Sequence, residues 1–131
     1  MAFAVRALLM AASVSAIFSV ASAAKADVAD FYTNKNIFMI ISSGNGGGYD
    51  ALARTVGRHI TKHISGHPNV VPRNMPGAGG LVMTNHVANA APADGTNIGA
   101  PQRGVPFEPL LGQASKAKFD PRNLQWIGSV N

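Results

Sequence analysis

Cysteine is absent from the sequence, which excludes disulfides, thiolate metal sites, thiol catalysis and a lipid-modified cysteine at a cleavage site. Charged residues are also scarce, at 13% of the chain, and only six residues are acidic. Because 47% of the residues are hydrophobic, the composition is that of a globular chain rather than a disordered one. With 131 residues, the chain is long enough for one small domain at most.

The first 26 residues have the pattern of a secretory signal peptide. Arg6 supplies a positive charge, an apolar stretch covers residues 7–20, and two A-x-A cleavage sites follow, of which the one ending at Ala26 is favoured. The apolar stretch is short for a membrane span and is interrupted by serine, so an uncleaved anchor helix is the less favoured alternative. Export of a chain without cysteine predicts a location in the periplasm.

The mature chain, residues 27–131, is only mildly basic once Arg6 and Lys25 are removed. Its basic residues do not form the stripe that nucleic-acid binding requires, so no nucleic-acid partner is predicted. Arg54, Arg58 and Lys62 repeat every four residues, which is typical of a solvated helix face. A modest positive field still favours anionic ligands.

Apolar and amphipathic segments alternate along the mature chain. Residues 37–42 are a continuous apolar run, typical of a buried strand in a parallel sheet. Residues 51–64 have helical periodicity, and Asp50 precedes them as a candidate N-cap. The other predicted elements are a strand at 69–73, which Pro72 weakens or places near an edge, a helix at 81–91, and strands at 96–100 and 124–130. The order β-α-β-α-β-loop-β predicts an α/β fold with a parallel sheet.

Two glycine-rich loops and a third loop follow the first three predicted strands. They cover residues 42–50, 74–80 and 101–109. Ligands of open parallel sheets bind outside the carboxyl ends of the strands, where all three loops are expected to meet. The three loops together are therefore the candidate ligand site.

The first loop lacks the residues that nucleotide-binding and catalytic loops need. It has no lysine for a P-loop, and no acid lies near residues 70–71 for a dinucleotide-binding loop. Ser42 and Ser43 have no base placed near them by the sequence, and no G-x-S-x-G motif surrounds them. No catalytic residue and no cofactor is therefore predicted.

Three histidines invite a metal-site hypothesis. His59 and His63 are four residues apart and share a face of the predicted helix. The third, His67, lies beyond the predicted end of that helix, and no carboxylate is near in the sequence. A polar helix face that is rich in histidine is the favoured interpretation, and no metal is predicted.

The remaining interpretation of the loops is that they bind a ligand without reacting with it. Exposed amides of a glycine loop at a helix N-terminus attract anions, so two such loops side by side predict a site for a carboxylate. Asp50 leaves two alternatives open. If it caps the helix, a ligand must use the amides before it, whereas an Asp50 that faces the cleft favours a ligand that also carries a donor.

Four segments in a fixed order resemble the periplasmic substrate-binding receptors of tripartite tricarboxylate transporters, the Bug receptor family. They are "GGGYD" followed by "ALAR", "VVPRNMPGAGG", "ANAAPADGTNIG" and "FDPRNLQWIGSV", and the resemblance covers about residues 36–131. It implies a hinged, two-lobed α/β protein of the type II periplasmic-binding-protein kind. Such a protein binds a small carboxylate, is not an enzyme, and delivers its ligand to membrane permease subunits.

Carried over to this sequence, the resemblance implies that main-chain amides of the first two loops hold the carboxylate and that the third loop lines the same cleft. The implied ligand-binding residues are Ser43, Asn45, Gly46, Gly47, Gly48, Tyr49, Asp50, Gly77, Ala78, Gly79, Gly80, Gln102 and Arg103.

The sequence departs from the family at several places. Gly44, Asn45 and Tyr49 replace a Pro-Pro pair and a threonine, and Arg103 stands where many relatives have a small hydroxyl residue. Tyr49 and Arg103 are therefore expected to change ligand choice. Arg103 either pairs a second carboxylate or is an ordinary exposed loop arginine.

Length is the largest departure, because the two lobes of that family need roughly 300 residues, in line with domains near 150. The chain is therefore expected to be a fragment that contains most of the first lobe, exposes apolar surface and cannot trap a ligand by hinge closure. Two other functions remain open. The same lobe could report its ligand to a signalling partner, or belong to a phosphate-handling α/β enzyme.

Overall fold

The computed structural model describes residues 27–111 and 116–130, so the expected signal peptide lies outside the described residues. None of the helices in the described ranges combines the length and the apolar character that crossing a bilayer requires. The α-helices are α2 (Val28–Tyr32), α3 (Gly48–Ile60) and α4 (Leu81–Asn89), and the strands are β1 (Asn36–Ile41), β2 (Asn69–Asn74) and β3 (Asn97–Ala100). Short 3₁₀ helices are η1 (Thr61–His63), η2 (Ala78–Gly80), η3 (Val105–Phe107) and η4 (Pro121–Asn123).

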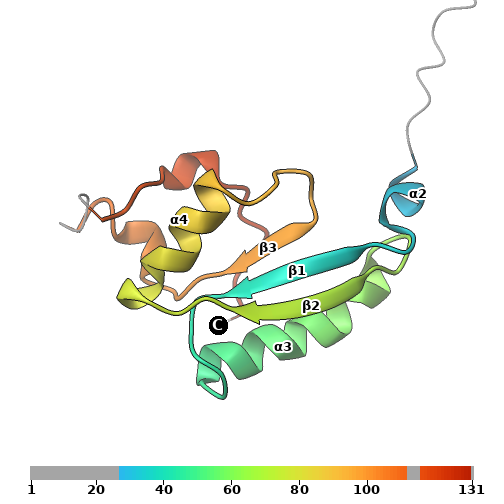
Figure 1. Ribbon diagram of the computed structural model, residues 1–131, viewed down its shortest axis with the longest axis horizontal. Coiled ribbons are helices and arrows are strands. Elements are labelled where there is room, and N and C mark those ends of the chain that lie inside the picture. Colours follow the sequence, from blue (N-terminus) through green and yellow to red (C-terminus); the bar gives the residue numbers. More distant parts are fainter. Residues whose placement is uncertain (1–26, 112–115, 131) are drawn as a thin grey trace, which may run out of the picture.

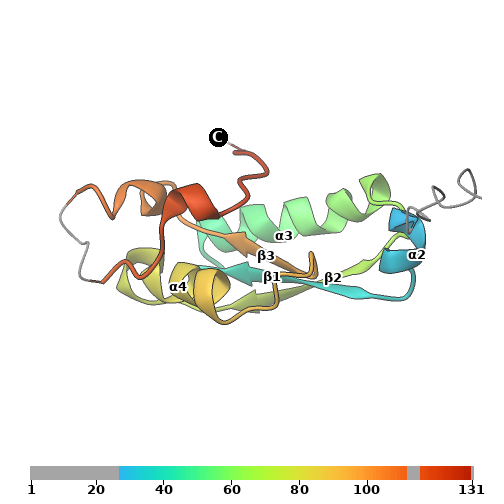
Figure 2. The ribbon, with the colours of Figure 1, turned by 90° about the horizontal axis from the view of Figure 1, so that it is seen from above.

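The three strands form one parallel sheet in the order β2-β1-β3, which confirms the predicted α/β fold with a parallel sheet. The chain runs from β1 outward to β2 and then back past β1 to β3 (Figure 1). Connections between parallel strands of one sheet are nearly always right-handed. Because β1–α3–β2 and β2–α4–β3 cross the sheet in opposite directions, their helices are expected on opposite faces. Figure 2 shows this arrangement, with α3 on one face of the sheet and α4 on the other.

The centre of the core is β1, the strand predicted from the continuous apolar run. Ile37, Met39, Ile40 and Ile41 are each no more than 3% exposed. Successive side chains of a strand point to opposite faces, and both faces of β1 are covered, so a strand here needs apolar residues at nearly every position. Met39 and Ile41 pack with Ala53 of α3 in the buried cluster.

Pro72 lies in the edge strand of the described sheet, as the sequence predicted. The amides of Asn69 and Met75 donate to Lys35 and Ile41 on the β1 side. By alternation along the strand, the nitrogen of Pro72 faces away from β1, where its missing N–H costs no ladder hydrogen bond. The proline also prevents a fourth strand from pairing fully with this edge.

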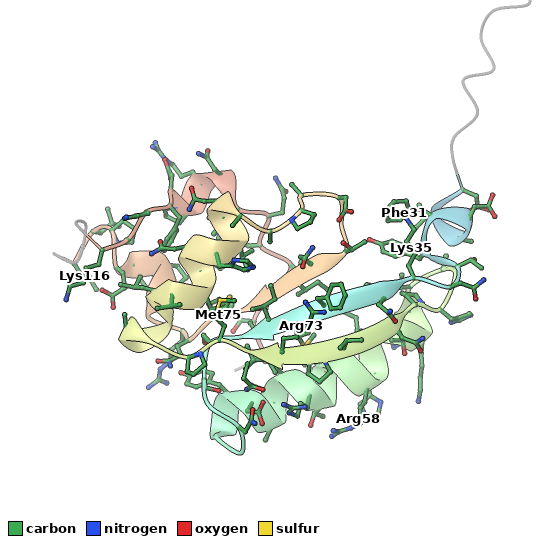
Figure 3. The ribbon with its side chains drawn as sticks, viewed as in Figure 1. Phe31, Lys35, Arg58, Arg73, Met75 and Lys116 are labelled. Atoms are coloured by element: carbon green, nitrogen blue, oxygen red, sulfur yellow. The ribbon has the colours of Figure 1, made fainter. Side chains whose placement is uncertain are left out.

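The helix α4 covers only part of its face of the sheet. It contacts β3 and β1. Beyond it, the exposed guanidinium of Arg73 lies 3.7 Å from the ring centroid of Phe38 (Figure 3). A cation over an aromatic ring thus covers apolar surface on the part of the sheet that α4 does not reach.

The first long helix begins earlier than predicted. Gly47 is the N-cap of α3, in an extended conformation, and Asp50 lies inside the first turn, so the expectation that Asp50 caps the helix is wrong. Glycine is an acceptable N-cap, and the carboxylate of Asp50 instead reaches back to the amide of Gly46. At its other end α3 stops at Ile60, and the 3₁₀ turn η1 continues to His63.

The predicted fourth strand at residues 124–130 is wrong. Among the described residues this segment pairs with no strand, and Ile127 and Val130 are 76% and 59% exposed. The indole N–H of Trp126 donates to the carbonyl of Pro121 at 2.7 Å, which ties the segment back to η4. Strand-like composition predicts a strand only where a neighbouring edge accepts it, and the sequence does not say whether one does.

Candidate functional site

The three loops meet at one edge of the sheet. Because the strands are parallel, their carboxyl ends share an edge, which we call the carboxyl edge (Figure 1). The first loop (residues 42–47) follows β1, the second (75–80) follows β2, and the third (101–104) follows β3. The connections after β1 and β2 leave for opposite faces, so the first and third loops flank the point where the strand order reverses. Ligands of doubly wound sheets bind at such a point.

Gly80 is where the three loops touch. A Cβ on Gly80 would lie 3.0 Å from Cγ2 of Val105 and 3.3 Å from Cβ of Ser42. Ser42 begins the first loop directly after β1, Val105 follows the third loop, and each is only 1% exposed. The hydroxyl of Ser42 also donates to the carbonyl of Ala100, at the end of β3, at 3.0 Å. The predicted convergence of the loops is therefore a packed contact.

The second loop has an unusual backbone. Gly77, Ala78, Gly79 and Gly80 have successive φ angles of 140°, 46°, 65° and 102°. Ala78 is not a glycine, so its left-handed conformation carries strain. Strained backbone of this kind concentrates at ligand-binding sites, where the surrounding structure fixes it.

Two helices start at the carboxyl edge with glycine N-caps. Gly47 precedes α3 and Gly80 precedes α4, and neither N-terminus receives a side-chain cap hydrogen bond. The first N–H groups of a helix have no partner inside the helix. Both helix starts carry a partial positive charge at the same edge, and they offer amide donors except at Gly80 and Leu81, whose amides donate to the carbonyls of Gly77 and Ala78.

Asp50 is buried, at 4% exposure, and its carboxylate is held inside the protein. It accepts hydrogen bonds from the amide of Gly46 at 2.9 Å, from Nε of Arg54 at 2.9 Å and from Nδ2 of Asn74 at 2.8 Å. Asp50, Arg54, Asn74 and the Gly46 amide form what we call the Asp50 cluster. Neither sequence-based alternative for Asp50 describes this arrangement, because the carboxylate neither caps the helix nor lies open to a ligand.

Hydrogen bonds set the ionisation of Asp50. The hydrogen bond from Arg54 is the largest cause, followed by those from Asn74 and Gly46, and together they lower the pKa of Asp50 from 3.8 to about 2. Asp50 is therefore ionised at neutral pH, and the Arg54 guanidinium balances its charge. The first loop consequently presents amide dipoles rather than a net negative charge.

The predicted site residues differ in their exposure to solvent. Ser43 has a buried hydroxyl with no hydrogen-bond partner among the described residues. Most of the remaining predicted residues lie on the surface of the three loops. Asn45, Gly46, Gly47, Gly48, Gly77, Ala78, Gly79 and Arg103 are exposed, Tyr49 and Gln102 are half-buried, and Gly80 is buried.

Sequence reasoning missed Arg54 as a member of the site, and it placed Asn74 in the second loop without assigning a role to its side chain. Arg54 was assigned to a solvated face with Arg58 and Lys62, but its side chain is two-thirds buried beside Asp50. The four-residue spacing from Asp50 to Arg54 is the usual spacing of a helix ion pair and could have indicated this contact. Asn74 carries a weaker signal, its position at the carboxyl end of a strand.

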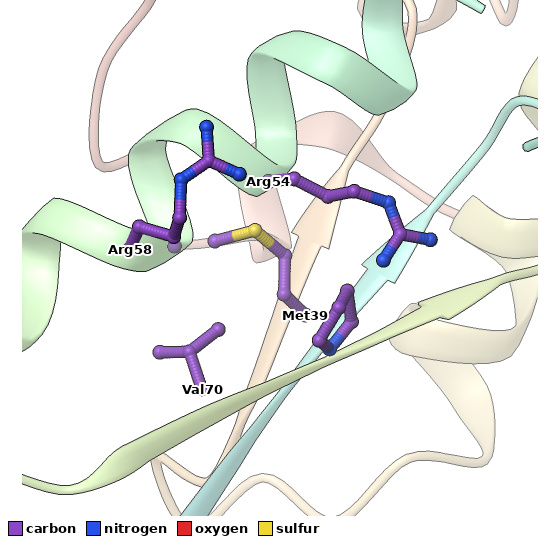
Figure 4. A pocket seen from close by; sticks show the side chains of 6 residues that line it. Met39, Arg54, Arg58 and Val70 are labelled. Carbon is purple, nitrogen blue, oxygen red and sulfur yellow. The ribbon is translucent and has the colours of Figure 1, made fainter. Parts of the chain in front are cut away.

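One hollow lies beside α3 and another lies beside the second loop. One, of about 140 Å³, lies between α3 and β2 and is lined by Met39, Arg54, Gly57, Arg58, Val70 and Pro72 (Figure 4). The other, of about 270 Å³, is lined by Ala78, Gly79, Leu81, Glu108 and Lys116. The second hollow contains two predicted site residues from the second loop, together with one charge of each sign.

The histidines do not form a metal site in the part of the chain that the structure describes, where no three potential ligands lie together. His59 is exposed on α3, and His67 places its ring Nδ1 3.3 Å from the carbonyl of Thr61.

The sequence matches no known protein-family model, and no curated protein is significantly similar to it. The resemblance to the transporter receptors therefore enters below as a proposal.

Proposed function

We propose that this chain contributes the ligand-binding lobe of an extracytoplasmic solute-binding protein of the Bug receptor kind. The lobe captures a small carboxylate in the periplasm and delivers it to the membrane permease subunits of a tripartite tricarboxylate transporter. A two-lobed type II periplasmic-binding-protein fold is part of this proposal, and the parallel sheet with strand order β2-β1-β3 is compatible with it.

One observation carries the proposal. Two helix N-termini with glycine caps and no side-chain cap start from loops that touch each other at the carboxyl edge. Amide donors at two such ends favour a ligand with a compact, delocalised negative charge, and a carboxylate accepts several hydrogen bonds of this kind. The hydroxyl of Ser43, which is buried and has no hydrogen-bond partner among the described residues, adds a polar group to the first loop.

Binding fits this edge better than catalysis does. Asp50, the carboxylate nearest to the first loop in sequence, is ionised and takes three hydrogen bonds from within the protein. The hydroxyl of Ser43 has no partner in the described residues, so no base there activates it. An edge with donors but no activated nucleophile supports capture of a ligand without reaction.

A thermal-shift screen of the full chain tests the proposal. Di- and tricarboxylates such as succinate and citrate should raise the melting temperature in a concentration-dependent manner, because they bind the folded state. A single lobe binds weakly, so millimolar ligand is required. Succinamide, which keeps the carbon skeleton but lacks the charge, is the matched control and should have no effect. A screen in which no carboxylate exceeds its neutral amide would contradict the proposed function.

A further inference from the structure

We infer that Arg54 and Asn74 are positioning residues, which fix the shape of the first glycine loop by holding Asp50 against the Gly46 amide. The effect on ligand affinity rests on the proposed function. The effect on the loop itself does not, because the hydrogen bonds are within the chain.

The Asp50 carboxylate joins three separate segments. One oxygen accepts the Gly46 amide from the first loop, at 2.9 Å. The other oxygen accepts both Nε of Arg54, one turn further along α3, and Nδ2 of Asn74, at the end of β2. A buried carboxylate with three donors is held in one position, and the amide that it accepts is held with it.

Asn74 uses its whole side-chain amide in this cluster. Its nitrogen donates to Asp50 and to the carbonyl of Ser43, at 2.8 Å and 2.9 Å, and its oxygen accepts from Nη2 of Arg54 at 2.8 Å. Both N–H groups and the carbonyl therefore have partners, which also fixes the orientation of the amide. Asn74 links the start of the first loop to the end of the neighbouring strand.

Arg54 supplies two donors in the geometry of a planar fork. Its Nε donates to Asp50 while its Nη2 donates to Asn74. Figure 4 shows the Arg54 side chain extending toward the carboxyl ends of the strands, whereas Nη2 of Arg58, one turn along α3, donates to Oγ1 of Thr55. A lysine keeps the charge but lacks two donors on one rigid plane, so it cannot replace both contacts.

The Asp50 cluster also narrows the set of amides that a ligand can use. The Gly46 amide is occupied by Asp50, and the backbone of Gly46 is left-handed, with φ at 81°. The amide of Gly47 points to the carbonyl of Gly44 at 3.4 Å. The amides of Gly48 and Tyr49, in the first turn of α3, are among the donors that remain for a ligand on this side.

The test compares Arg54→Met and Arg54→Lys with Arg122→Met in the full chain. Arg122 forms a matched ion pair with Asp120 outside the site. At neutral pH, hydrogen exchange of the Gly46 amide should be at least roughly tenfold faster in both Arg54 variants, because an opened hydrogen bond exposes the amide. The Arg122 variant should leave that rate unchanged.

A second measurement separates positioning from general destabilisation. In the native chain, the chemical shift of the Gly46 amide should follow the titration of Asp50 near pH 2. In both Arg54 variants this transition should move upward toward 3.8, the ordinary pKa of an aspartate. If Arg54→Met does not fold, Arg54→Lys and Asn74→Ser carry the test. A Gly46 amide that behaves as in the native chain in these variants would overturn the inference.

Citrate titration of the same variants keeps the two proposals apart. The Arg54 variants should bind citrate roughly tenfold more weakly, as when partners that orient binding groups are removed elsewhere. If the native chain binds no carboxylate, the proposed function fails while the exchange result still decides the role of Arg54. If the native chain and both Arg54 variants bind citrate equally, the positioning role for the ligand fails while the proposed function stands.

Discussion

Two aspartate–arginine pairs in this protein lower the pKa of the aspartate to a similar extent, but the pairs have different structural roles. A hydrogen bond from the neighbouring arginine is the largest cause in both cases, and it lowers the pKa of Asp50 and of Asp120 to about 2. The side chain of Asp50 is 5% exposed, whereas that of Asp120 is 34% exposed and its partner Arg122 is 87% exposed. A low pKa alone therefore does not reveal whether a carboxylate organises the fold.

The difference lies in the distance along the chain that each pair spans. Asp120, the N-cap of η4, is hydrogen-bonded to Arg122, two residues away. Asp50 joins the first loop, α3 and β2, and its contact with Asn74 spans 24 residues. An exposed, local pair is screened by water and salt, while a buried pair that links separate elements resists their separation. We therefore expect the pair at the carboxyl edge to stabilise the fold and the pair in the C-terminal segment to contribute little.

The solvent exposure of large apolar side chains also differs between the core and the C-terminal segment. Along β1 they are buried, apart from the half-buried Phe38. Among the described residues, most of the exposed large apolar side chains occur after residue 106. These are Phe107, Leu110, Leu111, Trp126, Ile127 and Val130. The expected exposure of apolar surface is thus found mainly in the C-terminal segment.

The largest expected difference comes from truncating one isoleucine in each region. Ile41→Ala removes a side chain that is 0% exposed, and we expect a loss of about 2–5 kcal/mol in unfolding free energy. Ile127→Ala removes a side chain that is 76% exposed, and we expect a change within about 0.5 kcal/mol. Urea unfolding followed by circular dichroism measures both. Equal losses of unfolding free energy would show that Ile127 is packed as tightly as Ile41, which would contradict the difference in their exposure.

A smaller difference is expected between two adjacent glycines of the second loop. Gly80→Ala forces a left-handed alanine against Val105 and Ser42, at 3.0 Å and 3.3 Å, and should cost about 2–3 kcal/mol. Gly79→Ala carries the same kind of strain with no atom within 4 Å, and should cost about 1 kcal/mol. The difference between the two unfolding midpoints measures the contact among the three loops. If Gly80→Ala is the milder change, that contact is not tight.

The smallest expected effect is on the pH dependence of stability. Because both folded-state pKa values lie below 3.8, each pair stabilises the fold above that pH and loses its contribution as the pH falls from 3.8 to about 2. Asp50→Asn should lower the melting temperature at neutral pH, because an amide N–H replaces one acceptor of the three hydrogen bonds. It should also flatten the decline of the melting temperature in this acid range, because the titrating carboxylate is removed.

Asp120→Asn is the matched control for this experiment. Its effect should be near the error of the measurement and should vanish in high salt, because solvent screens an exposed pair. Melting curves recorded for both variants from neutral to acid pH decide the question. A larger loss in Asp120→Asn than in Asp50→Asn would reverse the comparison.

The sequence predicted the elements whose cause is local. The apolar run at residues 37–42 became the buried β1, and Pro72 lies at the edge of the described sheet. The alternation of strands and helices predicted the parallel arrangement, and with it the meeting of the loops at one edge. These features follow from burial and backbone geometry, which the pattern of apolar residues, glycines and prolines records directly.

Features that depend on distant partners were not predicted. Asp50 has the chemistry of an N-cap, but its actual donors include Asn74, which the chain brings close only after β2 forms. Residues 124–130 have a strand-like composition, but no described strand pairs with them. In both cases the local preference of the residues did not decide the structure, because the tertiary partner, which selects between the alternatives, was not visible in the sequence.

Citrate titration of the ¹⁵N-glycine-labelled full chain, followed by amide chemical shifts, would locate carboxylate binding along the backbone. If the carboxyl edge binds citrate, saturable shifts should occur at Gly48 and at the second-loop glycines Gly77 and Gly79, with little change at Gly57 in α3 and Gly99 in β3. Shifts that are uniform along the chain, or absent from the loop glycines at saturating citrate, would contradict the claim that the carboxyl edge binds a carboxylate through its backbone amides.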